Sequence, residues 1–124
     1  MDKKTMAIVS YITIIGWLIS FFSYKGTEKD SLVSYHLKQS FGLFLTAFCI
    51  NIALIILTKI LVAIALAGIA FLVVITTILG LLSTIIYITY LVLFIIGIIT
   101  ASKGEEKPLP IIGKMFEGKF DFIP

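Results

Sequence analysis

The sequence predicts an all-α, polytopic membrane protein with four transmembrane helices, and three observations predict it. Hydrophobic residues make up 60% of the 124 residues and charged residues only 14%, whereas soluble domains carry about 25% charged residues. All ten basic residues are lysines, and they flank or separate the apolar runs. Those runs reach the roughly 20 residues that cross a hydrocarbon core about 30 Å thick. We therefore expect residues 1–124 to form a single membrane domain.

The first two spans are predicted at residues 6–24 and 33–58. Residues 6–24 carry no charge, have lysines on both sides, and are not followed by the small residues of a signal-peptide cleavage site, so the segment is retained as a span. The second helix follows a polar connection, starts amphipathic and becomes wholly apolar. Lys59 either marks its end, with the ammonium reaching back to water, or is a charge on a transport pathway.

Residues 60–101 contain no charge and are too long for one span, since 42 residues of helix would reach about 63 Å. A break at Gly80 divides them into spans at 60–78 and 81–101, and Gly68 is a second candidate for the break. The alternative is a long third span from about residue 71 to 101, in which Thr76, Gly80 and Thr84 form a small-residue packing stripe. The sequence therefore favours four spans and leaves three open.

The lysines predict a multi-pass protein of the bacterial cytoplasmic membrane with both termini in the cytoplasm. With four spans, the lysine-rich tails share the positively charged inner side, whereas three spans would separate them. The tail at residues 102–124 contains Pro108 and Pro110, which exclude a helix through them. Its later residues alternate charged with apolar side chains, so we expect a short interfacial segment that lies on the membrane.

The composition excludes several functions. No aromatic residues interleave with arginines, so a nucleic-acid partner is not expected. No carboxylate lies inside a predicted span, and no phosphate-binding loop or serine or zinc motif is present. Cys49 is the only cysteine, so an intramolecular disulfide is excluded. We expect no enzyme, no cofactor and no metal, and the lipid bilayer as the main partner.

His36, Gln39 and Asn51 are polar residues for which both a functional and a purely structural role can be proposed. His36 is either a proton-responsive or partner-binding group or an interfacial histidine bonded to a neighbouring helix, and Gln39 lies one turn away on the same side. Asn51 either lines a polar path or hydrogen-bonds across a helix interface.

The sequence resembles a family of small bacterial membrane proteins related to the import component of the chloroplast inner-envelope translocon. Four segments carry the resemblance: YITIIGW at 11–17, VSYHLKQS at 33–40, IGIITA at 96–101, and Gly104 followed by KPLPIIG at 107–113. In the second segment, Tyr35 and Lys38 stand where the family often has phenylalanine and arginine. The resemblance implies a helical membrane protein with a part in polypeptide translocation, and it makes Tyr35, His36, Lys38 and Gln39 candidate interaction residues.

The leading hypothesis is a non-enzymatic component or accessory of a membrane assembly, such as protein import or insertion, that works as a homo- or hetero-oligomer. The alternative is a small channel or transporter, with Thr46, Asn51 and Thr58 facing a polar path. A third hypothesis, a membrane-perturbing protein of the holin or toxin type, rests on size and hydrophobicity alone.

Overall fold

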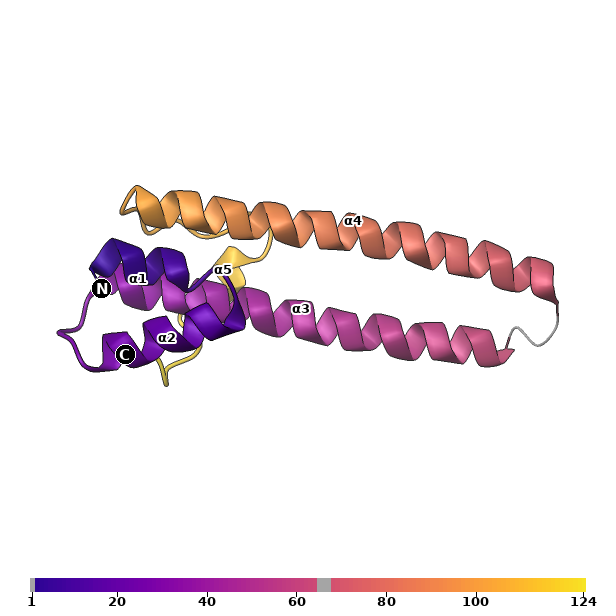
Figure 1. The fold of residues 1–124 in the computed structure, drawn as a ribbon, viewed down its shortest axis with the longest axis horizontal. Coiled ribbons are helices and arrows are strands. Elements are labelled where there is room, and N and C mark those ends of the chain that lie inside the picture. Colours follow the sequence, from indigo (N-terminus) through magenta and orange to yellow (C-terminus); the bar gives the residue numbers. More distant parts are fainter. Residues whose placement is uncertain (1, 65–67) are drawn as a thin grey trace. The chain divides into compact units, whose positions relative to one another are not determined.

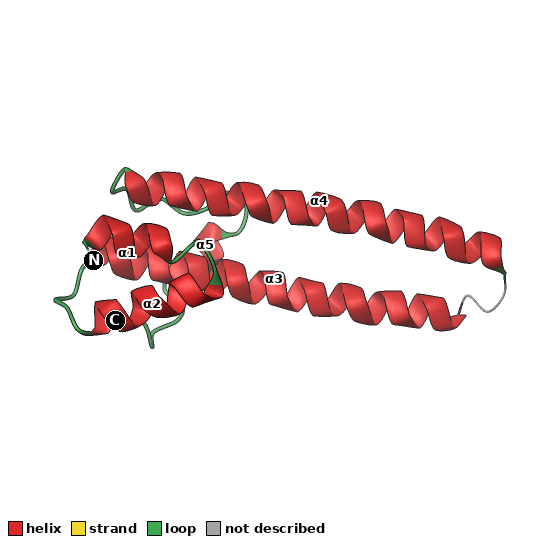
Figure 2. Ribbon diagram, in the orientation of Figure 1, coloured by secondary structure: helices red, strands yellow, loops and turns green. Residues whose placement is uncertain are grey.

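The computed structural model describes residues 2–64 and 68–124, and every regular element in them is a helix (Figure 1, Figure 2). The elements are α1 (Lys3–Val9), α2 (Ile14–Lys25), α3 (Ser31–Ile64), α4 (Ile69–Ser102) and α5 (Gly113–Phe116). The chain divides into two compact units. Unit 1 comprises Met1–Leu45 and Val92–Pro124, and unit 2 comprises Thr46–Leu91.

Two helices of the described chain, α3 and α4, are long and apolar enough to cross a membrane. Each has 34 residues, which corresponds to about 50 Å of helix against a hydrocarbon thickness of about 30 Å. The all-α class is therefore confirmed for the described residues. The prediction of four spans is wrong. The alternative of one long helix from about residue 71 to 101 is confirmed by α4, but residues 6–24 do not form a further helix long enough to span.

The first predicted span, at 6–24, is divided between two short helices. α1 ends at Val9, and Thr13 begins α2 as its N-cap, with Oγ1 accepting the backbone N–H of Gly16 at 3.1 Å. Helices of 7 and 12 residues rise only about 10 and 18 Å. The prediction failed because the length of an apolar run does not reveal a cap inside it, where a side chain can replace a helical hydrogen bond.

The boundaries predicted at Lys59 and Gly80 are also wrong. α3 continues through Lys59 to Ile64, and α4 passes through Gly80 without a break, so the spans at 33–58, 60–78 and 81–101 do not exist as separate helices. A single glycine costs a helix only about 1 kcal/mol relative to alanine, which the apolar helix around it tolerates. The second candidate break, Gly68, directly precedes α4; residues 65–67 lie outside the described part of the chain.

Unit 1 has a core that draws on segments from both ends of the chain. Its buried cluster contains Met6 of α1, Trp17 and Tyr24 of α2, Val33 and Leu37 of α3, and Ile123 of the tail. Phenylalanine rings pack around this cluster: Phe41 meets Phe120 at a centroid distance of 4.8 Å. The interfacial location expected for residues 114–124 stays a prediction; within the chain, Phe116 and Ile123 of this segment and Leu109 before it are buried in unit 1.

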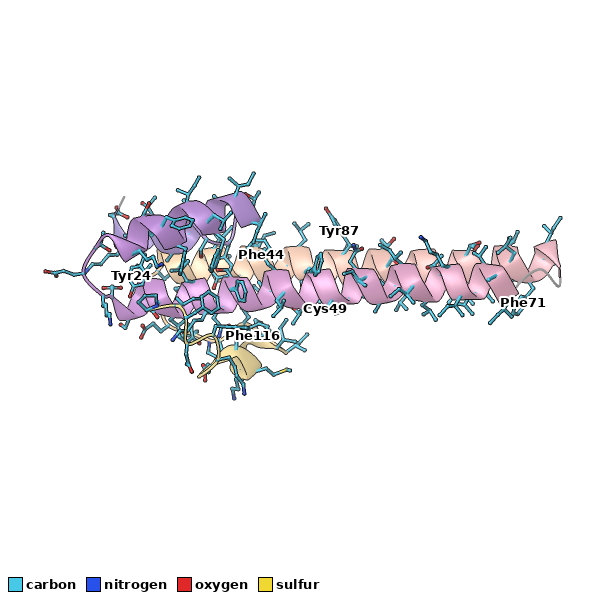
Figure 3. All side chains as sticks on the ribbon, turned by 90° about the horizontal axis from the view of Figure 1, so that it is seen from below. Tyr24, Phe44, Cys49, Phe71, Tyr87 and Phe116 are labelled. Atoms are coloured by element: carbon cyan, nitrogen blue, oxygen red, sulfur yellow. The ribbon has the colours of Figure 1, made fainter. Side chains whose placement is uncertain are left out.

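Unit 2 consists of the second part of α3 and the first part of α4, and its side chains are mostly exposed. Figure 3 shows apolar side chains projecting outward along both segments, with Cys49, Phe71 and Tyr87 among them. Phe71 is 51% exposed and Tyr87 75%. An exposed surface this apolar is what lipid covers in a membrane protein, because in water it would associate.

Candidate functional site

The segment 33–40 occupies the first turns of α3 and is buried to an unusual degree for polar residues. His36, Gln39 and Ser40 are each at most 1% exposed, while Tyr35 and Lys38 are half-buried. The spacing of three residues places His36 and Gln39 on the same face of the helix. Both side chains bind the backbone of the tail.

His36 connects three segments of unit 1. Its Nε2 lies 2.7 Å from the backbone carbonyl oxygen of Glu105, and its Nδ1 lies 2.8 Å from the hydroxyl of Tyr11. A carbonyl oxygen can only accept, so Nε2 carries the proton and the Nδ1 lone pair accepts from the Tyr11 hydroxyl. Both ring nitrogens are therefore bonded in the neutral imidazole, with the Nε2–H tautomer assigned by its partners.

Gln39 binds the tail at two points. Its Nε2 donates to the carbonyl oxygen of Gly113 at 2.8 Å, and its Oε1 accepts the backbone N–H of Leu109 at 3.2 Å. A Cβ at Gly113 would lie 2.7 Å from Oε1 of Gln39 and 2.8 Å from the backbone carbon of Pro108, so this close approach requires glycine. We call the bonds of His36 and Gln39 to Tyr11, Glu105, Leu109 and Gly113 the tail joint.

Two further glycines allow aromatic rings to pack beside the tail joint. A Cβ at Gly97 of α4 would overlap the ring of Tyr11, and a Cβ at Gly42 of α3 would lie 2.5 Å from the ring of Phe116. Trp17 adds a hydrogen bond from Nε1 to the carbonyl oxygen of Leu37 at 3.0 Å. The tail joint is thus enclosed by residues from α2, α3, α4 and α5.

Tyr35 and Lys38 line a neighbouring pocket in unit 1 with a volume of about 470 Å³. The Tyr35 hydroxyl donates to the Glu117 carboxylate at 2.9 Å. Lys29 and Lys38 line the pocket together with Glu106 and Glu117, so its walls carry both signs of charge. The pocket is therefore not a dedicated site for either an anion or a cation.

Asn51 is not brought into this site. It lies on α3 within unit 2 and is exposed. Thr58, also expected on a polar path, is half-buried and donates its hydroxyl to the carbonyl oxygen of Leu54 in its own helix at 2.8 Å. The sequence candidates thus divide: Tyr35, His36, Lys38 and Gln39 belong to unit 1, and Asn51 to unit 2.

Metal binding has no constellation to support it in the described residues. Within 2–64 and 68–124, no three histidine, cysteine or carboxylate side chains are grouped as a metal ion requires. The polar atoms of the tail joint are already used for holding the tail. The arrangement suits mechanical attachment of one segment to another.

Tyr11, Gly97 and Phe116 complete the site although sequence reasoning did not select them individually. Tyr11 and Gly97 lie in two of the four segments that carried the family resemblance. The sequence of those segments does not indicate that the two residues are in contact. A buried polar group needs a partner, so His36 and Gln39 signalled that partners exist. Which segments supply them depends on the tertiary fold.

Asp30 caps α3 and predicts a dependence of stability on pH. Its Oδ1 accepts the N–H groups of Leu32 and Val33 at 2.9 and 3.2 Å, and its Oδ2 lies 3.2 Å from Lys3 Nζ. Burial raises the pKa of Asp30, but the Val33 N–H, Lys3 and the Leu32 N–H together hold that pKa below its ordinary value. The carboxylate therefore stabilises the fold above the unfolded-state pKa of about 3.9, and this stabilisation is lost as the pH falls through the lower folded-state pKa.

We expect Asp30→Ala to cost about 1 kcal/mol at neutral pH, the usual contribution of an N-cap. Thermal unfolding followed between pH 6 and 3 should show the difference between wild type and variant shrinking as the carboxylate is protonated. A difference that is constant across this range would contradict the role of the charged carboxylate.

Comparison with known proteins identifies one family. The family model described as the magnetosome magnetite crystal formation protein family matches residues 2–116. No curated protein and no solved structure matches the chain. The expected relationship to the chloroplast import component is therefore wrong. The segments that suggested it are the ones that meet around the tail joint, where they hold the helical fold together.

Proposed function

Because the chain belongs to the magnetosome magnetite crystal formation protein family, we propose that it is a membrane protein that acts in magnetite crystal formation without catalysing a reaction. The observation that carries this proposal is the extent of the match, which runs from the residue before α1 to the last residue of α5. The matched region includes both long apolar helices and the tail joint. The magnetosome membrane thus replaces the cytoplasmic membrane as the proposed location.

The tail joint supports the non-enzymatic part of the proposal. Both nitrogens of His36 and both polar atoms of the Gln39 amide are bonded within the protein. The hydroxyl of Ser40 donates to the carbonyl oxygen of His36 in the same helix at 2.7 Å. A general base needs an available lone pair within reach of a substrate, and these groups are committed to the fold. That the protein works as a homo- or hetero-oligomer stays a prediction.

Two spans put the termini on the same side of the membrane, and the lysines indicate which side. Every acidic residue and nine of the ten lysines lie in unit 1, the lysines being at positions 3, 4, 25, 29, 38, 103, 107, 114 and 119. Because lysines concentrate on the cytoplasmic side, we propose that residues 2–30 and 103–124 lie on the cytoplasmic side of the membrane and that neither segment crosses it. The same distribution is difficult to reconcile with four spans, which place residues 25–30 outside.

Cysteine labelling tests this topology. The protein is expressed in a bacterium without magnetosomes, so that it enters the cytoplasmic membrane, and carries Cys49→Ala. In this background, Lys29→Cys and Lys119→Cys should both react with a membrane-impermeant maleimide in inverted vesicles and be protected in intact spheroplasts. A cysteine at Ile69, which is 82% exposed at the start of α4, serves as the matched control for the opposite side. Labelling of Lys29 and Lys119 from opposite sides would contradict a two-span topology.

The proposed role is tested in a magnetite-forming bacterium that lacks its own members of the family. Wild-type protein should restore crystal size, measured by electron microscopy, and a fluorescent fusion should follow the magnetosome chain. Gln39→Leu should fail to restore size, while Lys114→Ala on the exposed side of α5 should behave as wild type. Correct localisation of a stable wild-type protein with unchanged crystals would overturn the proposal.

A further inference from the structure

The first two helices form a hairpin, and the open end of the hairpin, which we call its mouth, is where the start of α1 and the end of α2 meet charged residues. α1 and α2 pack against each other in unit 1. The start of α1 is tied to the residue just before α3 by the ion pair between Lys3 and Asp30. Asp30 also exchanges backbone hydrogen bonds with the hydroxyl of Tyr24, near the end of α2, at 3.0 and 3.1 Å. Both ends of the hairpin therefore lie with the polar residues that precede α3.

One face of α2 and the tip of the hairpin are apolar and uncovered. The buried face of α2 presents Gly16, Trp17, Ser20 and Tyr24 to the protein. The opposite face carries large apolar side chains that are between 43% and 66% exposed: Ile12 at the tip, and Ile14, Ile15, Leu18, Ile19 and Phe22 along the helix. Steps of three and four residues, as between positions 15, 18, 19 and 22, place side chains along one side of a helix. We call these six residues the hairpin face.

Contacts with α4 show how deep the tip reaches. The ring of Tyr11 fills the space beside Gly97, five residues before α4 ends at Ser102. Five residues of helix correspond to about 7.5 Å, and α1 itself rises about 10 Å. Half of the hydrocarbon core is about 15 Å thick. If Ser102 and Lys103 mark the polar boundary, the tip lies within one leaflet and does not reach the other side.

Three backbone N–H groups at the tip are bonded inside the protein, which lowers the cost of placing the turn in lipid. The N–H groups of Ser10, Tyr11 and Ile12 donate to carbonyl oxygens of α1 at 3.1 Å each. The Ser10 hydroxyl donates to Ala7, and Thr13 caps α2. Non-helical backbone at membrane depth is tolerated where protein covers it, and Ser10 and Tyr11 of this turn are buried in unit 1. A loop exposed to water would have no such requirement.

We propose that α1 and α2 form a re-entrant hairpin inserted into the cytoplasmic leaflet, with the hairpin face covered by lipid acyl chains. The parts of α3 and α4 that lie in unit 1 also expose apolar side chains, for example Leu45, Val92 and Ile99, so lipid around the two long helices would also be available to the hairpin face. Lysines 3, 4 and 25 stand at the mouth, where anionic headgroups attract them. The proposal requires a membrane protein but no role in crystal formation.

Nitroxide depth measurements on the full-length protein in phosphatidylethanolamine and phosphatidylglycerol vesicles test the insertion. Spin labels are attached to single cysteines at Ile12, Ile15, Ile19, Phe22 and Lys25 in a Cys49→Ala background, and collision rates with oxygen and with a water-soluble nickel chelate are compared. We expect the greatest depth, about 8 to 10 Å from the length of α1, at Ile12 and Ile15. The depth should then fall steadily to the headgroups at Lys25.

Two control positions calibrate the measurement. A label at Ile85, 62% exposed on α4, should lie deep in the hydrocarbon, and a label at Lys119 in the tail should be in water. The proposal is overturned by nickel collisions throughout the hairpin face, which mean contact with water. It is equally overturned by low collision rates with both reagents, which mean contact with a second copy or another protein, or by a depth that crosses the midplane, which means a span.

Discussion

Replacing Gln39 by leucine is expected to lower the free energy of unfolding by roughly 2–6 kcal/mol and to release the tail. The amide of Gln39 satisfies the Gly113 carbonyl and the Leu109 N–H, and each buried backbone group left without a partner costs about 1–3 kcal/mol. Leucine fills a similar volume, so the loss reports the hydrogen bonds more than a cavity. Thermal unfolding in detergent, followed by circular dichroism, measures the change.

Limited trypsin digestion gives the second readout for this variant. Lys114 and Lys119 lie in the tail and neither is followed by proline, so trypsin should cleave after them faster once the tail joint is broken, because cleavage requires local opening. Lys38→Ala is the matched control: it changes the preceding residue on α3, which is half-buried beside the pocket, and should shift stability by no more than about 0.5 kcal/mol. Equal stability of Gln39→Leu and Lys38→Ala would mean that the tail is held by apolar packing alone.

Gly97→Ala is expected to destabilise unit 1 by about 1–3 kcal/mol although it adds a single methyl group. The new Cβ would overlap the ring of Tyr11, and overpacking a filled core has this typical cost. The ring has little freedom to withdraw, because its hydroxyl is bonded to His36. The substitution therefore disturbs the tail joint from the side of α4.

Gly80→Ala provides the control for Gly97→Ala within the same helix. Within residues 2–64 and 68–124, and leaving aside the adjacent residues and the surrounding backbone of α4, nothing lies within 4 Å of a Cβ placed at Gly80. Alanine is favoured over glycine in a helix interior by about 1 kcal/mol. We expect Gly80→Ala to leave stability unchanged or raise it, in the same thermal unfolding assay. Destabilisation by Gly80→Ala would indicate that the helix is interrupted there, as the sequence had suggested. If Gly97→Ala left stability unchanged, the close contact between Gly97 and the Tyr11 ring would be contradicted.

The helical membrane class followed from the sequence because it depends on sums over many residues. A chain with 60% hydrophobic residues and charges kept outside its apolar runs has too little polar surface for water, whatever its detailed fold. The number of spans could not be predicted from such sums. It depended on whether single residues such as Thr13, Lys59 and Gly80 interrupt a helix, and each of those effects is about 1 kcal/mol or less, so packing decides the outcome.

The candidate site divides in the same manner. His36 and Gln39 stood out because polar side chains in an apolar chain need partners, and the structure places both at the tail joint. Asn51 stood out for the same reason, but lies exposed in unit 2. The identity of the partners could not be predicted, since Gln39 and Gly113 are 74 residues apart and no local pattern connects them.

By itself, the sequence determined that the protein is helical, that it belongs in a membrane, and that its charges gather outside the apolar runs. These properties follow from composition and from the cost of placing charge or unbonded backbone in hydrocarbon. Only the tertiary structure decided that residues 6–24 fold back as α1 and α2, and that the tail returns to α3. Those outcomes rest on a few specific contacts, the Tyr11 ring against Gly97 and the Gln39 amide against the tail backbone, which exist only once distant segments have packed together.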